Sequence, residues 1–180
     1  MKAKTRHILR VAGRLLTPMG MAAVIIAGAC TNDECYENKN SLPLAGFYSS
    51  DSHPASISLD SISIIGIGAP GDSVLHDSVS GLSQSYLPFR IDQGETVYEI
   101  KYLSGMLGRY RIADTITFNY EIVPWFVSSA CGAVYDYKIT SIETTHNIID
   151  SVVCPMGVID NTNAENLRIY FRVATKEEGE

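Results

Sequence analysis

The chain has 180 residues, of which 46% are hydrophobic and 19% charged, so it is long enough for one domain with a buried core. Its formal net charge of −6 is uneven, because residues 1–29 hold five of the 14 basic residues and no acidic one. The rest keeps 9 basic and 20 acidic residues, a net charge of −11. Such a domain repels phosphates, so we expect no nucleic-acid partner.

The first 29 residues have the layout of an export signal. Residues 1–14 are basic and polar, and residues 15–29 are apolar and end in small residues. A transmembrane helix needs about 20 apolar residues, whereas the uninterrupted run here, residues 19–29, has 11. We therefore predict that residues 1–29 are a cleaved lipoprotein signal peptide.

The cleavage site contains a cysteine, Cys30, directly after small residues. The segment Ile26-Ala27-Gly28-Ala29-Cys30 resembles a lipobox, in which the cysteine sulfur is acylated before cleavage, although the usual leucine is replaced by Ala27. Residues 27–29 also satisfy the A-x-A rule, which would release a soluble protein. The position of the cysteine favours the lipobox, so Cys30 is the expected lipidation site and the bilayer an expected partner.

Residues 30–43 are polar and turn-rich, and we predict that they form a lipidated tether. Asp33 and Glu34 follow the cysteine closely and resemble the acidic surface-export signals of Bacteroidota lipoproteins. The expected location is therefore the outer membrane, lipid-anchored, with the domain exposed at the cell surface.

The remaining chain alternates between apolar and polar residues, as β-strands do. The last segment is the clearest, since Leu167, Ile169, Phe171 and Val173 alternate with polar neighbours or Tyr170. Turn-forming residues separate the segments. The expected strands are residues 44–48, 56–67, 73–76, 86–91, 96–102, 115–122, 134–139, 147–153 and 166–173.

This pattern predicts an all-β fold. Short strands without a helical period favour an antiparallel two-sheet, immunoglobulin-like sandwich of about seven to nine strands over residues 44–174. A partly open barrel is the alternative. Residues 175–180 are expected to form a flexible tail.

Four cysteines are present, and export places them in an oxidising compartment. If Cys30 is acylated, one disulfide and one free thiol are the simplest outcome. A Cys35–Cys131 bridge would pin the tether to the domain, and a Cys131–Cys154 bridge is the second possibility. Cys154 ends an apolar run, which is typical of a buried thiol.

Catalytic and metal-binding motifs are weak, and we expect no catalytic residue, no metal site and no cofactor. Ser83, His76 and Asp77 could form a triad only by chance contact, and Cys131 with His146 is a similar case. Residues 160–165 are acidic and amide-rich but lack the EF-hand pattern.

The aromatic residues are the best candidates for binding. Most of the ten tyrosines lie in or beside expected strands, where cross-strand packing explains them. The segment Val123-Pro124-Trp125-Phe126-Val127 is either a binding edge or a strand corner with a bulge at the proline. Trp125 and Phe126 are therefore the candidate binding residues, for an envelope protein or a glycan.

The chain resembles a family of small Bacteroidota lipoproteins, each a domain of unknown function. The resemblance lies in segments from Cys30 to Glu37, in residues 59–68, 86–89, 114–120 and 130–132, and in residues 146–151. Members similarly have a second cysteine after the lipid cysteine and a later Cys-Gly, which implies the pair Cys35 and Cys131. Ala130 departs from the glutamate usual before the Cys-Gly.

Together these features predict a membrane-anchored envelope lipoprotein that is a non-enzymatic binding or structural module. The alternatives are a hydrolase with a Ser83 or Cys131 nucleophile and a calcium-stabilised adhesion module that uses residues 160–165.

Overall fold

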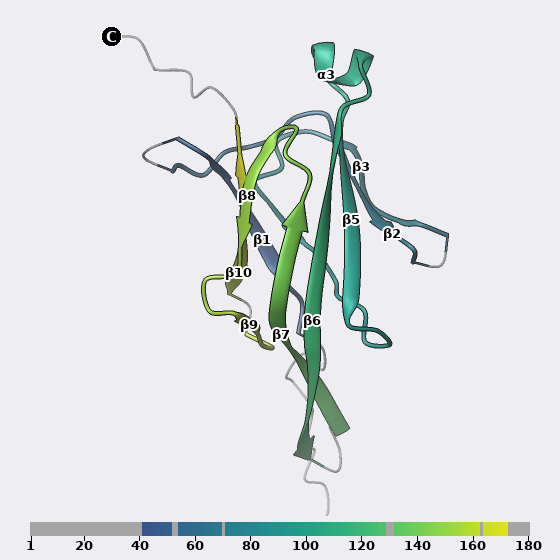
Figure 1. Ribbon diagram of the computed structural model, residues 1–180, viewed down its shortest axis with the longest axis vertical. Helices are drawn as coiled ribbons and strands as arrows, with labels where there is room; N and C mark the ends of the chain where they lie inside the picture. The colour runs from purple at the N-terminus through teal and green to yellow at the C-terminus, as the bar shows by residue number, and fades with distance from the viewer. Residues whose placement is uncertain (1–40, 52–53, 70, 129–131, 163, 173–180) are drawn as a thin grey trace, which may run out of the picture. The chain divides into compact units, whose positions relative to one another are not determined.

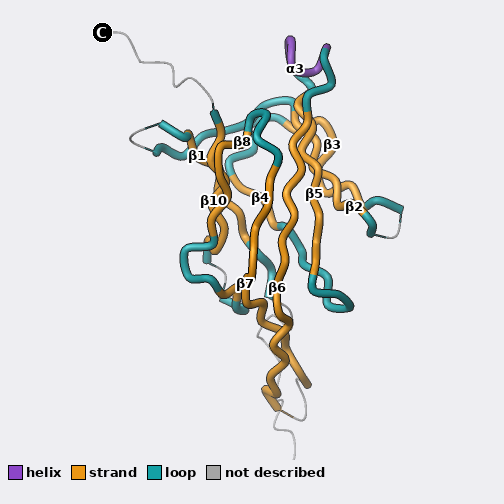
Figure 2. The backbone as a smooth tube through the Cα atoms, in the orientation of Figure 1, coloured by secondary structure: helices purple, strands orange, loops and turns teal. Residues whose placement is uncertain are grey.

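The computed structural model describes residues 41–51, 54–69, 71–128, 132–162 and 164–172, and these form ten strands and one short helix (Figures 1 and 2). In chain order the elements are β1 (Leu44–Ser49), β2 (Ile62–Ile67), β3 (Ser73–Val79), β4 (Gln84–Tyr86), β5 (Glu95–Tyr102), α3 (Gly105–Arg109), β6 (Ala113–Ser128), β7 (Gly132–Thr144), β8 (Ile149–Val153), β9 (Val158–Ile159) and β10 (Glu165–Phe171).

The strands form two open sheets that pack into a sandwich, so the predicted all-β class is confirmed. One sheet has the order β3-β2-β5-β6-β7-β9, and the other has the order β4-β1-β10-β8. The described strands number ten rather than seven to nine, because β4 and β9 contain only three and two residues.

The first and last strands lie side by side and run in the same direction. β1 pairs with β10 in parallel, from Leu44 opposite Glu165 to Ser49 opposite Phe171, whereas the other strand pairs are antiparallel. A parallel pair needs a long connection between its strands, and here the whole of the larger sheet supplies it.

The core lies between the two sheets and is built from the alternate residues that period two predicts. Phe47, Leu167, Ile169 and Phe171 face inward from the smaller sheet and are fully buried. From the larger sheet come Ile62, Ile64, Tyr98, Ile100, Tyr102, Ile116, Phe118, Tyr120 and Tyr137. Aromatic rings therefore fill much of the space between the sheets.

The expected strand at residues 86–91 is mostly a crossover between the sheets. Leu87 and Phe89 are buried, and the Phe89 ring stacks on Tyr120 at a centroid distance of 4.6 Å. The crossover backbone bonds to side chains, since the Tyr120 hydroxyl donates to the Arg90 carbonyl at 2.8 Å and the Tyr98 hydroxyl to the Pro88 carbonyl. The segment is extended and alternating without joining a sheet.

The expected strand at residues 56–67 is divided in the structure. Ser56 and Leu59 form only isolated bridges, and β2 begins at Ile62. Ser61 adopts a positive φ of 54°, outside the β region, which ends strand geometry there. An unbroken alternation of residue types did not reveal this break.

α3 and the far end of β6 mark opposite ends of the larger sheet (Figure 1). α3 connects β5 to β6, and β6 then runs for 16 residues from Ala113 to Ser128. At about 3.3 Å per residue, the two ends of β6 lie roughly 50 Å apart. The two ends of the sandwich therefore carry separate surfaces.

Candidate functional site

β6 and β7 continue past their neighbours as a two-stranded ribbon, residues 123–128 and 132–136. β5 pairs with β6 only as far as Asn119, and β9 pairs with β7 at Tyr137 and Lys138. Beyond these points, among the residues that the structure describes, β6 and β7 pair only with each other, as Trp125 does with Val134. Figure 1 shows both strands extending beyond the others at the end opposite α3.

The ribbon tip, residues 123–126, exposes four consecutive apolar side chains. Val123 and Trp125 share one face, while Pro124 and Phe126 share the other. The exposed fractions of the Trp125 and Phe126 side chains are 39% and 69%. Exposed apolar side chains on both faces of a projecting ribbon are candidates for contact with another molecule.

Pro124 is compatible with this strand because of its place at the sheet margin. Proline lacks a backbone N–H and is found in strands where no ladder bond is needed. The β6–β7 register passes Pro124 opposite Tyr135 without a shift, and the shifts occur instead at Asn119/Tyr120 and Phe126/Ser128. The alternative of a bulge at the proline is therefore wrong.

The beginning of the described chain contacts the base of the ribbon. The Ser41 hydroxyl donates a hydrogen bond of 3.1 Å to Oδ1 of Asp136, which lies opposite Val123 in the ribbon register. Ser41 is buried. Two rows farther from the tip, Lys138 pairs with Glu121 at 3.2 Å, and both are exposed. Ser41, at the start of the described residues, therefore lies at the base of the ribbon.

The end that carries α3 has a different chemistry. Met106 and Tyr110 are exposed, as are the guanidinium groups of Arg109 and Arg111. A cavity of about 370 Å³ opens beside them, between the loop and the outer side of β5, where Lys101 pairs with Glu99 at 3.1 Å. This surface is both apolar and cationic.

His76 contacts a serine, but the serine is not Ser83. The His76 Nε2 atom lies 2.9 Å from the Ser85 hydroxyl, and that hydroxyl donates to the Tyr86 carbonyl at 3.1 Å. Ser85 is buried, and its hydroxyl has both this carbonyl and the imidazole nitrogen within hydrogen-bond distance. Ser83 is exposed, so the triad considered from the sequence is not assembled.

Asp77 is likewise engaged away from the imidazole. Its carboxylate accepts hydrogen bonds from the hydroxyls of Ser63 and Ser78, at 3.2 and 3.3 Å. His76 and Asp77 are neighbours in β3 and project to opposite faces. The space beside His76 is an open cavity of about 330 Å³, lined mainly by Leu44, Leu75, Tyr86 and Pro88.

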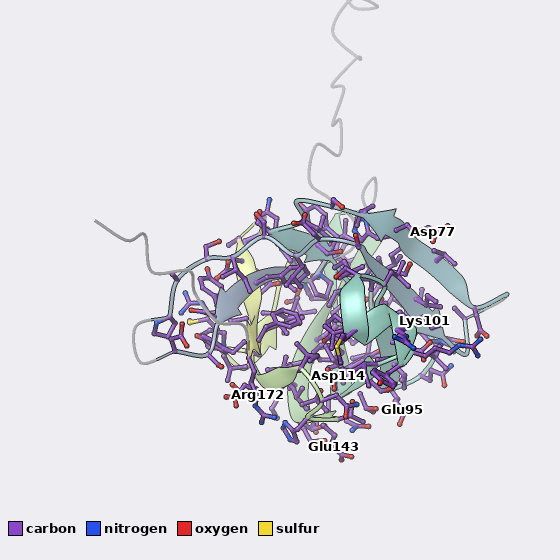
Figure 3. All side chains as sticks on the ribbon, turned by 90° about the horizontal axis from the view of Figure 1, so that it is seen from above. Asp77, Glu95, Lys101, Asp114, Glu143 and Arg172 are labelled. Carbon is purple, nitrogen blue, oxygen red and sulfur yellow. The ribbon has the colours of Figure 1, made fainter. Side chains whose placement is uncertain are left out.

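Asp114 is a buried carboxylate that the sequence analysis missed (Figure 3). Its oxygens accept hydrogen bonds from the Tyr102 and Thr145 hydroxyls and from the backbone N–H groups of Asn147, Ile148 and Ile149, all at 2.8–3.0 Å. Burial raises the pKa of the carboxyl, but the hydrogen bonds outweigh it, so the pKa lies below its ordinary value. All five donors serve one structural contact, which fixes the connection from β7 to β8.

A periodicity argument would have found Asp114. It falls on the same parity as Ile116, Phe118 and Tyr120, the inward face of β6. An acidic residue at an inward position is buried only with partners, and this parity is visible in the sequence.

The cysteines proposed as site residues, Cys30, Cys35 and Cys131, lie outside the described residues, as does His53. Cys154 carries a free, half-buried thiol. Burial raises the pKa of this thiol, and hydrogen bonds from the backbone at Gly157 and Met156 oppose the effect without cancelling it.

In the loop considered for calcium, residues 160–165, the carboxylate of Asp160 is used in a local turn. Asp160 accepts hydrogen bonds from the backbone N–H and hydroxyl of Thr162, and Asn163 lies outside the described residues. Over the described parts of the chain, no three His, Cys, Asp or Glu side chains gather as a metal-binding group.

Among the residues that the structure describes, no helix has the length and apolarity needed to cross a membrane.

Comparison with known families identifies the domain. A family model described as a family of unknown function, DUF6452, matches residues 61–171, more than half of the chain. The chain belongs to this family. The DUF6452 match begins just before β2 and ends with β10, so it includes the larger sheet and the ribbon but not β1. Neither the curated proteins nor the solved structures gave a match.

Proposed function

We propose that this DUF6452 chain is a non-enzymatic envelope lipoprotein, anchored by lipid on Cys30, that makes contact through the ribbon tip. The observation that carries the proposal is the run of exposed apolar side chains at residues 123–126, on two strands that extend past the sandwich. A protein that needed no contact there would gain solubility from polar residues at this tip.

Support for the anchor comes from the order of residues at the beginning of the chain. A basic segment, an apolar segment and small residues lead directly to Cys30. The acidic residues Asp33 and Glu34 fit surface export of the Bacteroidota type, so the proposed location is the outer membrane with the domain exposed outside. The likeness to small Bacteroidota lipoproteins supports the same location.

The proposed disulfide joins Cys35 to Cys131. In the sequence, Cys131 lies between the end of β6 and the start of β7, and Cys35 lies six residues before Ser41. The bridge would tie the tether to the turn of the ribbon as well as to its base, and a bridge over so long a loop adds about 4 to 5 kcal/mol of stability.

The side chains of the ribbon tip indicate which class of partner it can bind. Sugars are bound by an aromatic face flanked by polar side chains, whereas the side chains on the same ribbon face as Trp125 include Val123 along the strand and Val134 opposite it. The tip therefore suits an apolar surface better than a glycan. An apolar surface in the envelope is either another protein or the lipid bilayer.

Metabolic labelling with an alkyne fatty acid tests the anchor. The native chain is expected to carry the label and to fractionate with membranes, and Cys30→Ala to lose both. Cys154→Ala is the matched control, since Cys154 is half-buried within the domain, and it should keep the label. An unlabelled native chain, or a labelled Cys30→Ala, contradicts the proposal.

Two further measurements test location and the absence of catalysis. Protease added to intact cells is expected to remove the domain, and survival of the chain there contradicts surface display. Activity-based probes for serine and cysteine nucleophiles are expected not to label the folded protein. Labelling that is lost in Ser85→Ala or Cys154→Ala would make the protein an enzyme.

A further inference from the structure

We propose that the ribbon tip, residues 123–126, inserts shallowly into the same bilayer that holds the Cys30 lipid, as a second membrane contact. This inference rests on the proposed function, because it needs the chain to be lipid-anchored. It identifies the partner of the ribbon tip as lipid rather than as a protein.

The first argument is the position at which the tether enters the domain. The Ser41 hydroxyl bonds to Asp136, and Asp136 lies opposite Val123 in the register. Phe126 is three residues farther along β6, which corresponds to about 10 Å. The point where the tether reaches the domain and the ribbon tip are therefore adjacent.

The second argument is the length of the tether. Ten residues, 31–40, lie between Cys30 and Ser41, which makes eleven Cα-to-Cα steps. Fully extended, they span at most about 36 to 40 Å, so an acylated Cys30 keeps Ser41 within this distance of the bilayer. The ribbon tip lies well inside that range, and tethering raises its effective concentration at the membrane.

The third argument is the composition of the ribbon. Residues 122–135 contain no charged residue, although 19% of the chain is charged. Charges are costly in a bilayer, and tryptophan is enriched at the level of the lipid headgroups. Asp136, opposite Val123, is the first charged residue at the base, Glu121 and Lys138 follow it, and these charges mark where the ribbon leaves the lipid.

The backbone limits the depth of insertion. A two-stranded ribbon has unpaired N–H and C=O groups along both edges, and these cannot be satisfied in hydrocarbon. Pro124 removes one such N–H. The ribbon tip therefore belongs at the level of the headgroups and the upper acyl chains, and does not span the membrane.

The exposed apolar surface at α3 differs from the ribbon tip in its charge and in its distance from the tether. Met106 has the same exposed fraction as Phe126, 69%, but it lies beside Arg109 and Arg111. It also lies in α3, beyond the end of β6 opposite the ribbon tip, and about 40 Å of strand separates the start of β6 from Trp125. Charge and distance from the tether thus distinguish the ribbon tip as the membrane contact.

Trp125 is the single tryptophan of the chain, so its fluorescence reports on the ribbon tip alone. The purified mature lipoprotein, with acylation of Cys30 verified by mass spectrometry, is reconstituted into phosphatidylcholine vesicles with brominated acyl chains. Bromine quenches tryptophan on contact. We expect stronger quenching from bromine near the headgroup than from bromine at mid-chain.

Two variants with matched exposure control the measurement. Phe126→Ser keeps the reporter and is expected to lower the quenched fraction by about twofold or more, since it removes a large apolar side chain from the lipid. Met106→Ser changes a side chain of equal exposed fraction at the other end and is expected to leave the quenching unchanged.

The outcomes separate the two proposals. An acylated protein whose Trp125 is not quenched by bromine, and is quenched freely by aqueous iodide, overturns the membrane contact and leaves the anchor intact. Equal loss in Phe126→Ser and Met106→Ser also overturns it. An unmodified Cys30 overturns the proposed function itself.

Discussion

The Tyr102 hydroxyl donates a hydrogen bond of 2.9 Å to Oδ2 of Asp114, deep between the two sheets. Tyr102 ends β5 and Asp114 is the second residue of β6, while the other donors to Asp114 come from the connection between β7 and β8 and from Ile149, the first residue of β8. One carboxylate thus holds together two strands of the larger sheet and the chain that crosses to the smaller one.

Replacement of Asp114 by alanine is expected to destabilise the fold strongly. Asp114→Ala leaves three backbone N–H groups and two hydroxyls without their acceptor, and we expect a loss of about 3 kcal/mol in the free energy of unfolding. Denaturant unfolding measures the change. Glu143→Ala is the control, because Glu143 is exposed on β7, and a loss of similar size there would contradict the assignment.

The same carboxylate predicts a pH dependence. The pKa of Asp114 is lower in the folded protein than in the unfolded chain. Its contribution is therefore complete above the unfolded pKa of about 3.9 and disappears as the pH falls through the folded pKa. The free energy of unfolding should fall more steeply below pH ~4 in the native protein than in Asp114→Asn. Parallel curves for the two proteins would refute this origin.

Cys154 is expected to be slow to react in the folded protein. Burial raises the pKa of its thiol, so the reactive thiolate is scarce at neutral pH. A thiol reagent should label Cys154 rapidly only in denaturant, and Cys154→Ser identifies the contribution of this residue. Fast native labelling that disappears in Cys154→Ser would show the thiol to be accessible.

Two phenylalanines on β6 should behave in opposite ways. Phe118 is fully buried against Phe89, and Phe118→Ala is expected to cost about 3 to 5 kcal/mol. Phe126 is mostly exposed at the ribbon tip, and Phe126→Ser should change stability by less than about 0.5 kcal/mol. Unfolding curves of the unlipidated mature chain decide the matter, and a large cost for Phe126→Ser would make the ribbon tip a part of the core.

Alternation in the sequence was sufficient for the fold class and for strands such as β10. Leu167, Ile169 and Phe171 are buried as period two predicts. Alternation was misleading at residues 86–91, because an extended crossover that places Leu87 and Phe89 in the core has the same period as a strand. Several of its hydrogen bonds join residues distant in the chain, such as the Arg90 carbonyl with the Tyr120 hydroxyl and the Leu87 N–H with the Pro43 carbonyl, and these are not visible in the local pattern.

The order and direction of the strands could not be predicted from the local sequence pattern either. The parallel pairing of β1 with β10 joins Leu44 to Glu165, more than a hundred residues apart, and depends on how the intervening strands fold. The same holds for the contact of Ser41 with Asp136. The exposed character of Trp125 and Phe126 was predictable because a proline-containing apolar segment fits poorly in a central strand.

The parallel arrangement of the first and last strands has a mechanical consequence. Tension applied between Leu44, at the start of β1, and Phe171, at the end of β10, slides the two strands along each other. The bonds of the β1–β10 ladder are then loaded together instead of opening one after another. When the start of β1 is held and the end of β10 is pulled, the domain should for this reason unfold slowly under force.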